Sequence, residues 1–175
     1  MSARGAFVVA LATVAASGAA TASADAPHAA RAAATGATVQ STIVGVGGRV
    51  LSRARTVTAS ASSVRIGQRN CAVAAGTPLA VLLAVRRAGG PGFALRDYGD
   101  CGSSPVNSGQ LFVYSLGGET NRGQNGWEYE VDGVIGSTGA GDPSGPQGNG
   151  RRLRAGDRVV WFWCEAYRGG CKRKP

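Results

Sequence analysis

Histidine is almost absent from this chain of 175 residues, and the only one is His28, near the amino terminus. Serine and cysteine nucleophiles usually need a neighbouring base such as histidine, so the region after residue 28 offers little for nucleophilic catalysis. Zinc sites favour histidines or closely paired cysteines, and the chain provides neither after that point. The sequence therefore predicts no metal site, no cofactor and no enzymatic activity.

Long hydrophobic runs are also lacking. A membrane-spanning helix needs about 20 strongly apolar residues, whereas the run at residues 6–20 is short and mostly Ala, Thr, Ser and Gly. Arg4 precedes this run and Ala22-Ser23-Ala24 follows it, which is the layout of an export signal with its cleavage site. We expect a signal peptide over residues 1–24, no transmembrane segment after its removal, and a secreted or extracellular protein.

A phosphate-binding loop is missing as well. The glycine-rich stretch 136–150 lacks the Lys followed by Ser or Thr that ends a P-loop, and it opens no predicted helix, so nucleotide binding is not expected. Asp142, which precedes Pro143, is better suited to accept a backbone N–H two residues on and to stabilise the loop. Loops of this length in a compact domain are usually either functional or mobile.

Acidic residues are fewer than basic ones, which gives a formal net charge of +9. Most of the excess lies in the flanking segments, including the basic residues 172–174, and the central part of the chain is nearly balanced. Specific nucleic-acid binding favours a basic stripe on the fold with aromatic rings for stacking, and this distribution does not supply one. We expect instead an attraction to an anionic cell-envelope polymer, or a tail that only increases solubility.

The chain has four cysteines, Cys71, Cys101, Cys164 and Cys171. An even number in an exported chain predicts disulfides. Three connectivities are possible, and the sequence alone does not choose among them. We favour Cys164–Cys171, because the intervening residues 165–170 can turn back on themselves, and this leaves Cys71–Cys101 as the second bridge.

The domain boundary is less well marked. Residues 25–37 are rich in Ala and cannot bury enough surface to offset chain entropy. Residues 38–63 contain strand-like β-branched stretches, but their glycines and arginines suit a flexible stalk equally well. We assign residues 25–54 to a low-complexity linker and residues 55–175 to one domain with a basic tail.

One helix is predicted, over residues 78–87. Thr77 can cap its amino terminus and Gly89 ends it. One face of this helix is apolar and should pack on a sheet. The leucines on that face are Leu79, Leu82 and Leu83.

Strands are predicted on both sides of this helix. Residues 158–164 are apolar on both faces, which indicates a central strand, whereas residues 127–131 place two glutamates on one face, which indicates a solvated side. The other predicted strands cover residues 64–66, 71–73, 93–98 and 110–116. One helix on a mixed sheet of about five strands is an α+β, β-grasp-like arrangement, here stabilised by disulfides.

Three segments resemble a known family. They are residues 126–133 (GWEYEVDG), residues 139–142 (GAGD) and residues 153–161 (LRAGDRVVW). This combination is similar to the transcobalamin-like C-terminal domain, a small extracellular module that is mostly of unknown function in bacteria. The resemblance implies a β-grasp-like fold over roughly residues 64–163, and it departs from the family in the long insertion between Asp142 and Leu153.

The same resemblance suggests a ligand only in outline. In vertebrate cobalamin carriers the corresponding domain covers one face of the corrin ring with the help of a large helical domain, which this chain lacks. A complete cobalamin site is therefore not implied. A shared fold does not carry an activity with it.

Aromatic residues are the remaining candidates for a site. Trp127, Tyr129 and Trp161 could form a platform that offers broad apolar contact with one polar handle per ring, and Asp142 is added as a fourth ligand-binding candidate. The same rings could equally be core residues. The expected function is an exported non-catalytic binding module for a small molecule, such as a corrinoid, or for a cell-envelope component.

Two alternatives remain open. The first is a structural extracellular domain with no small ligand. The second is a weak glycoside hydrolase that uses Glu128 and Glu130, because a pair of carboxylates can act as acid and base on a glycosidic bond.

Overall fold

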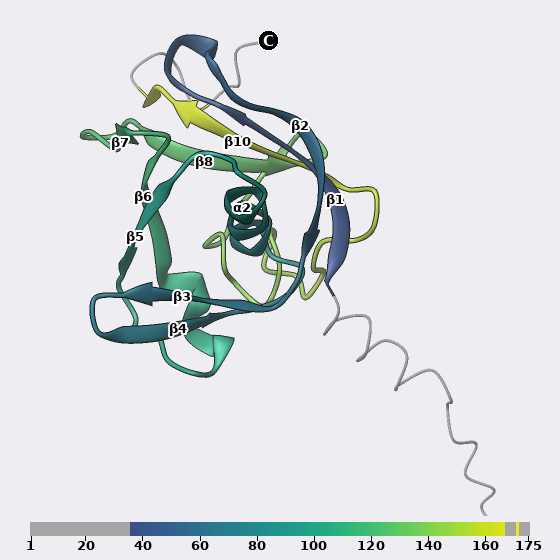
Figure 1. Ribbon diagram of the computed structural model, residues 1–175, viewed down its shortest axis with the longest axis vertical. Coiled ribbons are helices and arrows are strands. Elements are labelled where there is room, and N and C mark those ends of the chain that lie inside the picture. The colour runs from purple at the N-terminus through teal and green to yellow at the C-terminus, as the bar shows by residue number, and fades with distance from the viewer. Residues whose placement is uncertain (1–35, 167–170, 172–175) are drawn as a thin grey trace, which may run out of the picture.

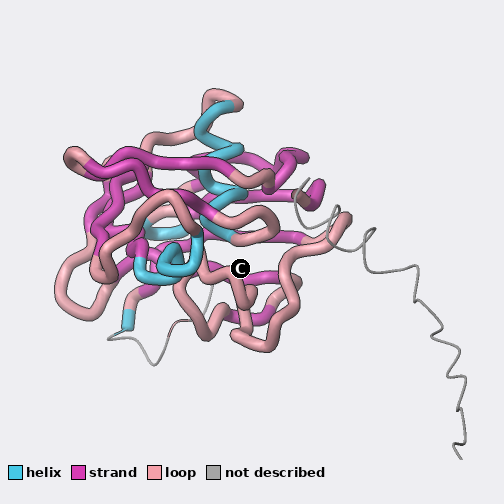
Figure 2. Tube along the Cα trace, turned by 90° about the horizontal axis from the view of Figure 1, so that it is seen from below, coloured by secondary structure: helices cyan, strands magenta, loops and turns pink. Residues whose placement is uncertain are grey.

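The computed structural model describes residues 36–166 and residue 171 (Figures 1 and 2). The predicted signal peptide, residues 1–24, lies outside this part of the chain. In chain order, the elements are β1 (Ala37–Val44), the 3₁₀ helix η1 (Val46–Gly48), β2 (Val50–Ala59), β3 (Ser62–Ile66), β4 (Arg69–Val73), α2 (Pro78–Arg87), β5 (Phe93–Asp97), the 3₁₀ helix η2 (Pro105–Gln110), β6 (Leu111–Leu116), β7 (Glu119–Thr120), β8 (Gly126–Val131), β9 (Val134–Ile135) and β10 (Arg158–Cys164).

The largest sheet has five strands in the order β2-β1-β10-β8-β9. β1 runs parallel to β10 and the other neighbours are antiparallel, so the predicted mixed sheet is confirmed. β10 is the central strand, as its sequence predicted. Trp161 on the face toward the helix and Phe162 on the opposite face are each only 1% exposed, so neither face of β10 meets solvent.

The predicted helix is present as α2, and its cap is confirmed. Thr77 Oγ1 accepts a hydrogen bond from the backbone N–H of Ala80 at 3.3 Å. The sequence predicted one buried face, but all eight residues from Pro78 to Val85 are buried. Figure 1 shows the reason, because strands surround α2 on several sides, and a helix covered in this way must be apolar all round.

Two smaller sheets complete this enclosure. β3 and β4 form a hairpin, and β5, β6 and β7 form a second antiparallel sheet. Figure 1 shows the hairpin below α2 and the second sheet to its left, with the five-stranded sheet above and to the right. The predicted strands that flank the helix in sequence therefore lie in these smaller sheets and do not join the large one.

The amino-terminal boundary of the domain differs from the prediction. Residues 25–54 were assigned to a linker, but residues 37–54 form β1 and the first part of β2. The alternate residues Val39, Ser41 and Ile43 of β1 are buried, and β1 pairs with the central strand. The linker assignment is wrong here because Ser41 places a polar residue at a core position and hides the alternation that marks a half-buried strand.

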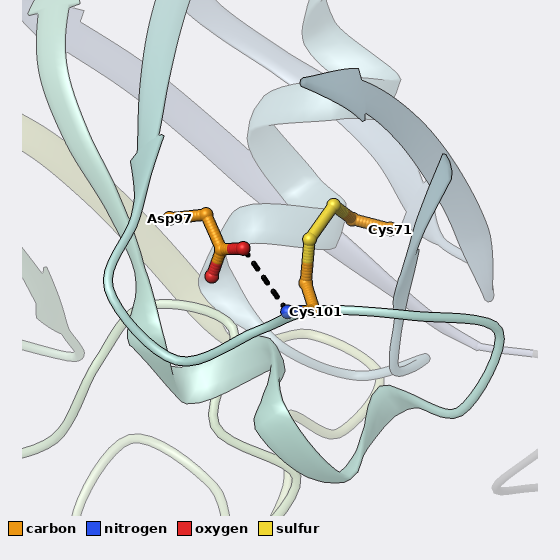
Figure 3. A group of neighbouring side chains, drawn as sticks. All are labelled: Cys71, Asp97 and Cys101. Carbon is orange, nitrogen blue, oxygen red and sulfur yellow. Dashed lines mark hydrogen bonds between the residues drawn. A yellow bond between two sulfur atoms is a disulfide. The ribbon is translucent and has the colours of Figure 1, made fainter. Parts of the chain in front are cut away.

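Both predicted disulfides are present, Cys71–Cys101 and Cys164–Cys171. Cys71 belongs to β4 and Cys101 to the loop after β5, so the first bridge ties the hairpin to the second sheet (Figure 3). The second bridge starts at the last residue of β10. No free cysteine occurs in the described part of the chain.

Removing the first bridge is expected to destabilise the fold more than removing the second. Cys71 and Cys101 are 30 residues apart in sequence and Cys164 and Cys171 are 7 apart. In the chain-entropy model these loops correspond to about 3.5 and about 2.5 kcal/mol of stabilisation. Thermal unfolding of the two double alanine variants, followed by circular dichroism, measures the difference, and an equal or larger loss at Cys164 and Cys171 would contradict this order.

Candidate functional site

Strands β8 and β10 bring the predicted aromatic residues together. Tyr129 lies opposite Trp161 in the strand register, and Trp127 lies opposite Trp163. The ring centroids are 5.6 Å apart in the first pair and 5.8 Å in the second, within the range of favourable aromatic contacts. The antiparallel register therefore builds two aromatic pairs, one edge-to-face and one tilted, on the face of the sheet that meets the helix.

The polar atoms of these rings differ in whether they have a hydrogen-bond partner. Trp127 Nε1 donates to the carbonyl oxygen of Glu119 at 2.9 Å, and the Tyr129 hydroxyl donates to the carbonyl oxygen of Thr138 at 2.8 Å. Trp161 Nε1 is buried and has no acceptor within the described residues. A buried N–H without a partner costs free energy, which a bound acceptor would recover.

The glycine-rich loop 136–150 packs against η2 and the helix. A side chain at Gly139 would lie 1.8 Å from the carbonyl oxygen of Gly109, so only glycine allows this close approach of two backbones. The carbonyl oxygen of Ala140 accepts a hydrogen bond from the backbone N–H of Leu79 at 2.8 Å. The loop therefore covers the amino terminus of α2 and forms a wall beside the aromatic pairs.

Asp142 stabilises this loop in the way the sequence indicated. Its Oδ1 accepts a hydrogen bond from the backbone N–H of Ser144 at 2.8 Å and another from the Ser144 hydroxyl at 2.6 Å. Its side chain also lies against Gly109 of η2. These contacts give Asp142 a structural role, and it does not line the cavity described next.

A cavity of about 250 Å³ lies at the seam between β6 and β8, which belong to different sheets. We call it the aromatic pocket. Three of the four predicted ligand-binding residues, Trp127, Tyr129 and Trp161, line it. The complete lining is Tyr98, Gly109, Gln110, Leu111, Phe112, Val113, Trp127, Glu128, Tyr129, Thr138, Gly139, Ala140 and Trp161.

Two aromatic residues of the pocket were missed from the sequence. Tyr98 and Phe112 are 65% and 43% exposed, and their ring centroids lie 6.0 Å apart. A sequence signal existed, because Phe112 alternates with Leu111 and Val113, which are buried, and so had to lie on the opposite face of its strand. These two rings supply accessible aromatic surface, since Trp127, Tyr129 and Trp161 are each at most 4% exposed.

Among the described residues that line the aromatic pocket none is basic, and the one acidic residue, Glu128, turns its side chain to the opposite face of β8 from Trp127 and Tyr129. Burial raises the pKa of Glu128 above its usual value of 4.5. Burial is also the main reason why the pKa of Tyr129 lies above 10.0, although its hydrogen bond to Thr138 acts in the opposite direction. The site is therefore poor in charge and disfavours anions.

Glu130 is buried, although the sequence predicted a solvated position. The sequence placed Glu128 and Glu130 on a solvated strand face, but Glu130 is only 8% exposed. It lies opposite Val160, and Glu128 lies opposite Phe162, on the face of the sheet turned away from the aromatic pairs. The expectation of a wet face is wrong for Glu130, because this part of the face is covered, as the 1% exposure of its cross-strand neighbour Val160 also shows.

The group Cys71, Asp97 and Cys101 is the one cluster of metal-ligating residue types among those described (Figure 3). Its sulfur atoms are bonded to each other, so they are not free thiolates for a metal ion. Asp97 accepts hydrogen bonds from the backbone N–H groups of Gly99 and Cys101, each at 3.0 Å, and pairs with Arg69 at 3.0 Å. This arrangement explains the cluster as a structural clamp.

The same contacts set the charge state of Asp97. Burial would raise its pKa, but the N–H groups of Gly99 and Cys101 and the guanidinium group of Arg69 outweigh burial and hold the pKa below the usual 3.8. Because the pKa is lowered on folding, the carboxylate contributes stability above pH 3.8, and this contribution is lost as the pH falls through the folded-state pKa.

A comparison with protein-family models found no matching family, and a comparison with curated proteins found no significant match. Among the described residues, no helix is long and apolar enough to cross a lipid bilayer. The resemblance to the transcobalamin-like domain thus remains a prediction.

Replacing Asp97 by asparagine is expected to destabilise the fold at neutral pH by about 1–3 kcal/mol, the usual range for losing hydrogen bonds to a charged group. The loss should shrink below pH 3.8, where the wild-type carboxylate also becomes protonated. Urea unfolding at pH 7 and pH 3 measures both values. A loss that is the same at both pH values would show that the charge of Asp97 is unimportant.

Replacing Glu128 by glutamine is expected to stabilise the fold at neutral pH, in contrast to the change at Asp97. The folded-state pKa of Glu128 is raised above 4.5, so the stability that its protonated form contributes is lost as the pH rises through that pKa. Glutamine removes the buried charge, and we expect a melting temperature higher by about 2 °C at pH 7 and unchanged at pH 4. Differential scanning calorimetry at the two pH values tests this, and a lower melting temperature at pH 7 would contradict it.

Proposed function

We propose that this protein is an exported, non-catalytic binding module and that the aromatic pocket is its ligand site. The observation that carries the proposal is the Nε1–H of Trp161, which has no partner among the described residues, whereas the polar atoms of the two buried rings beside it, Trp127 and Tyr129, are hydrogen-bonded by the protein. Tyr98 and Phe112 add exposed aromatic surface beside it. Exposed rings next to a few polar groups are typical of small-molecule sites.

The size and charge of the pocket favour a small, uncharged ligand. A volume of about 250 Å³ lies just below the range of about 300–1,000 Å³ that is typical of ligand pockets. A corrinoid could touch such a pocket with one edge only and could not be enclosed. An anionic polymer would meet no basic residue among the described residues that line the pocket. A single sugar unit combines an apolar face for Tyr98 and Phe112 with hydroxyl groups for Trp161.

A catalytic role is less well supported than binding. The hydrolase alternative needs two accessible carboxylates, and Glu130 is buried. The side chain of Glu128 lies on the face of β8 turned away from the aromatic pairs, so it supplies no acid and base pair within the aromatic pocket. The proposal therefore assigns no catalytic residue.

Export and fold type belong to the same proposal. The two disulfides support an oxidising compartment outside the cytoplasm. The helix packed on a mixed five-stranded sheet supports a β-grasp-like relationship to the transcobalamin-like domain, with the second sheet as an addition. A structural domain without a ligand is the alternative, and the low exposure of Trp127, Tyr129 and Trp161 favours it.

A ligand screen decides between these functions. We expect N-acetylglucosamine or a related neutral sugar to stabilise the protein, by about 2.7 kcal/mol at a hundredfold excess over the dissociation constant, with no turnover. Phe112→Ala and Tyr98→Ala should weaken binding, whereas Val106→Ala should not, because Val106 is 69% exposed and lies outside the pocket. Calorimetric titration measures the affinities.

Other results of the screen would point elsewhere. A lack of stabilisation by neutral sugars, corrinoids, haem and peptidoglycan fragments would favour the structural domain. Stabilisation by a corrinoid alone would favour the ligand that the family resemblance implies. Sugar hydrolysis that is lost in Glu128→Gln would support the enzyme alternative.

A further inference from the structure

A second hollow lies on a different part of the surface, between β3, β5 and the helix. Its volume is about 480 Å³, larger than that of the aromatic pocket. We call it the β3–β5 groove. Its apolar floor consists of Val64 and Ile66 from β3, Leu83 from α2, and Phe93 and Leu95 from β5.

The floor of this groove is incompletely covered by the described chain. Leu83 is buried, but the other four apolar side chains of the floor are only partly buried. The groove lies where β3 and β5 each have a free edge, since β3 pairs only with β4 and β5 only with β6 among the described strands. Contiguous apolar surface that remains in contact with water marks an interaction site.

An arginine gives the groove its charge. Arg65 and Arg86 line it, no carboxylate does, and neither arginine forms an ion pair with a described residue. Arg65 donates to the carbonyl oxygen of Gly67 and to the side chain of Gln68, and Arg86 donates to the carbonyl oxygen of Gly90. Arg65 alternates with Val64 and Ile66 on β3, so its side chain points to the opposite face of the strand from the floor. The guanidinium of Arg86 lies beside Gly92 of the groove, and because a guanidinium has five N–H donors it retains donors for an anion.

We propose that the β3–β5 groove binds an amphipathic carboxylate, a medium-chain fatty acid, whose aliphatic chain covers the apolar floor and whose carboxylate accepts hydrogen bonds from Arg86. The groove matches a fatty acid in both charge and polarity, because it offers a cationic hydrogen-bond donor beside an apolar surface. The proposal does not depend on the aromatic pocket, which is lined by different residues.

An extended peptide fits the groove less well. A strand inserted between β3 and β5 needs these strands to be about 9.6 Å apart, twice the spacing of paired strands. Cα atoms of β3 and β5 approach each other within 8 Å, which leaves no room for a peptide backbone along the whole groove. An aliphatic chain needs no backbone partners and fits the remaining space.

Titration with decanoate, below its micelle concentration, tests the proposal. We expect decanoate to bind at least about tenfold more tightly than 1-decanol, the value of one hydrogen bond to a charged group, and acetate not to bind. Arg86→Gln should weaken decanoate binding to the level of 1-decanol. Arg87→Gln is the matched control, because Arg87 lies in the same last turn of α2 and does not line the groove.

The position of the ligand and the integrity of the variants are checked separately. In methyl NMR spectra, decanoate should shift the signals of Leu83 and Leu95 and leave Leu111 of the aromatic pocket unchanged. Melting temperatures of Arg86→Gln and Arg87→Gln that equal the melting temperature of the wild-type protein show that neither change has disturbed the fold.

Several results would overturn the proposal. Equal affinities for decanoate and 1-decanol would show that Arg86 does not recognise the carboxylate. Equal losses in Arg86→Gln and Arg87→Gln would reveal a general effect of charge. Protection of the β3 amides from hydrogen exchange by an acidic peptide that decanoate does not displace would assign the groove to a peptide partner.

Discussion

The burial of helix α2 on all sides is the constraint on which the rest of the structure depends. Eight consecutive residues, Pro78 to Val85, are removed from water, so apolar surface must be supplied around the whole helix. Its polar ends are also satisfied within the fold. Ala140 accepts the N–H of Leu79 at the start, and Arg55 of β2 donates to the carbonyl oxygen of Ala88 at 2.9 Å at the end.

Enclosure by three separate sheets has a consequence for binding. Where two sheets meet around the helix, strands face each other without forming a ladder, and side chains at these seams remain only partly covered. The aromatic pocket lies at the seam of β6 and β8, and the β3–β5 groove lies at the seam of β3 and β5. Their chemistry differs because one seam carries mainly aromatic rings, whereas the other carries aliphatic side chains beside the guanidinium of Arg86.

Some of this could be predicted from local patterns. The cap at Thr77, the central position of β10 and the two disulfides follow from spacing, residue type and short connections, and all three are confirmed. The linker assignment for residues 37–54 and the solvated position of Glu130 were wrong. In both cases residues distant in sequence are involved, because β1 pairs with β10 and Glu130 lies beside the buried Val160 of β10.

The sequence by itself determined the helix with its cap at Thr77, the central position of residues 158–164, and that Trp127 and Tyr129 share one face of their strand, because these features depend on residue type, alternation and short-range spacing. Only the tertiary structure decided that Tyr98 and Phe112 lie beside these rings, that Asp142 stays outside the pocket, and that Arg86 lines the β3–β5 groove. These arrangements depend on how separate sheets meet around the helix. The angles and gaps at such meetings come from packing among residues far apart in the chain, which no local pattern records.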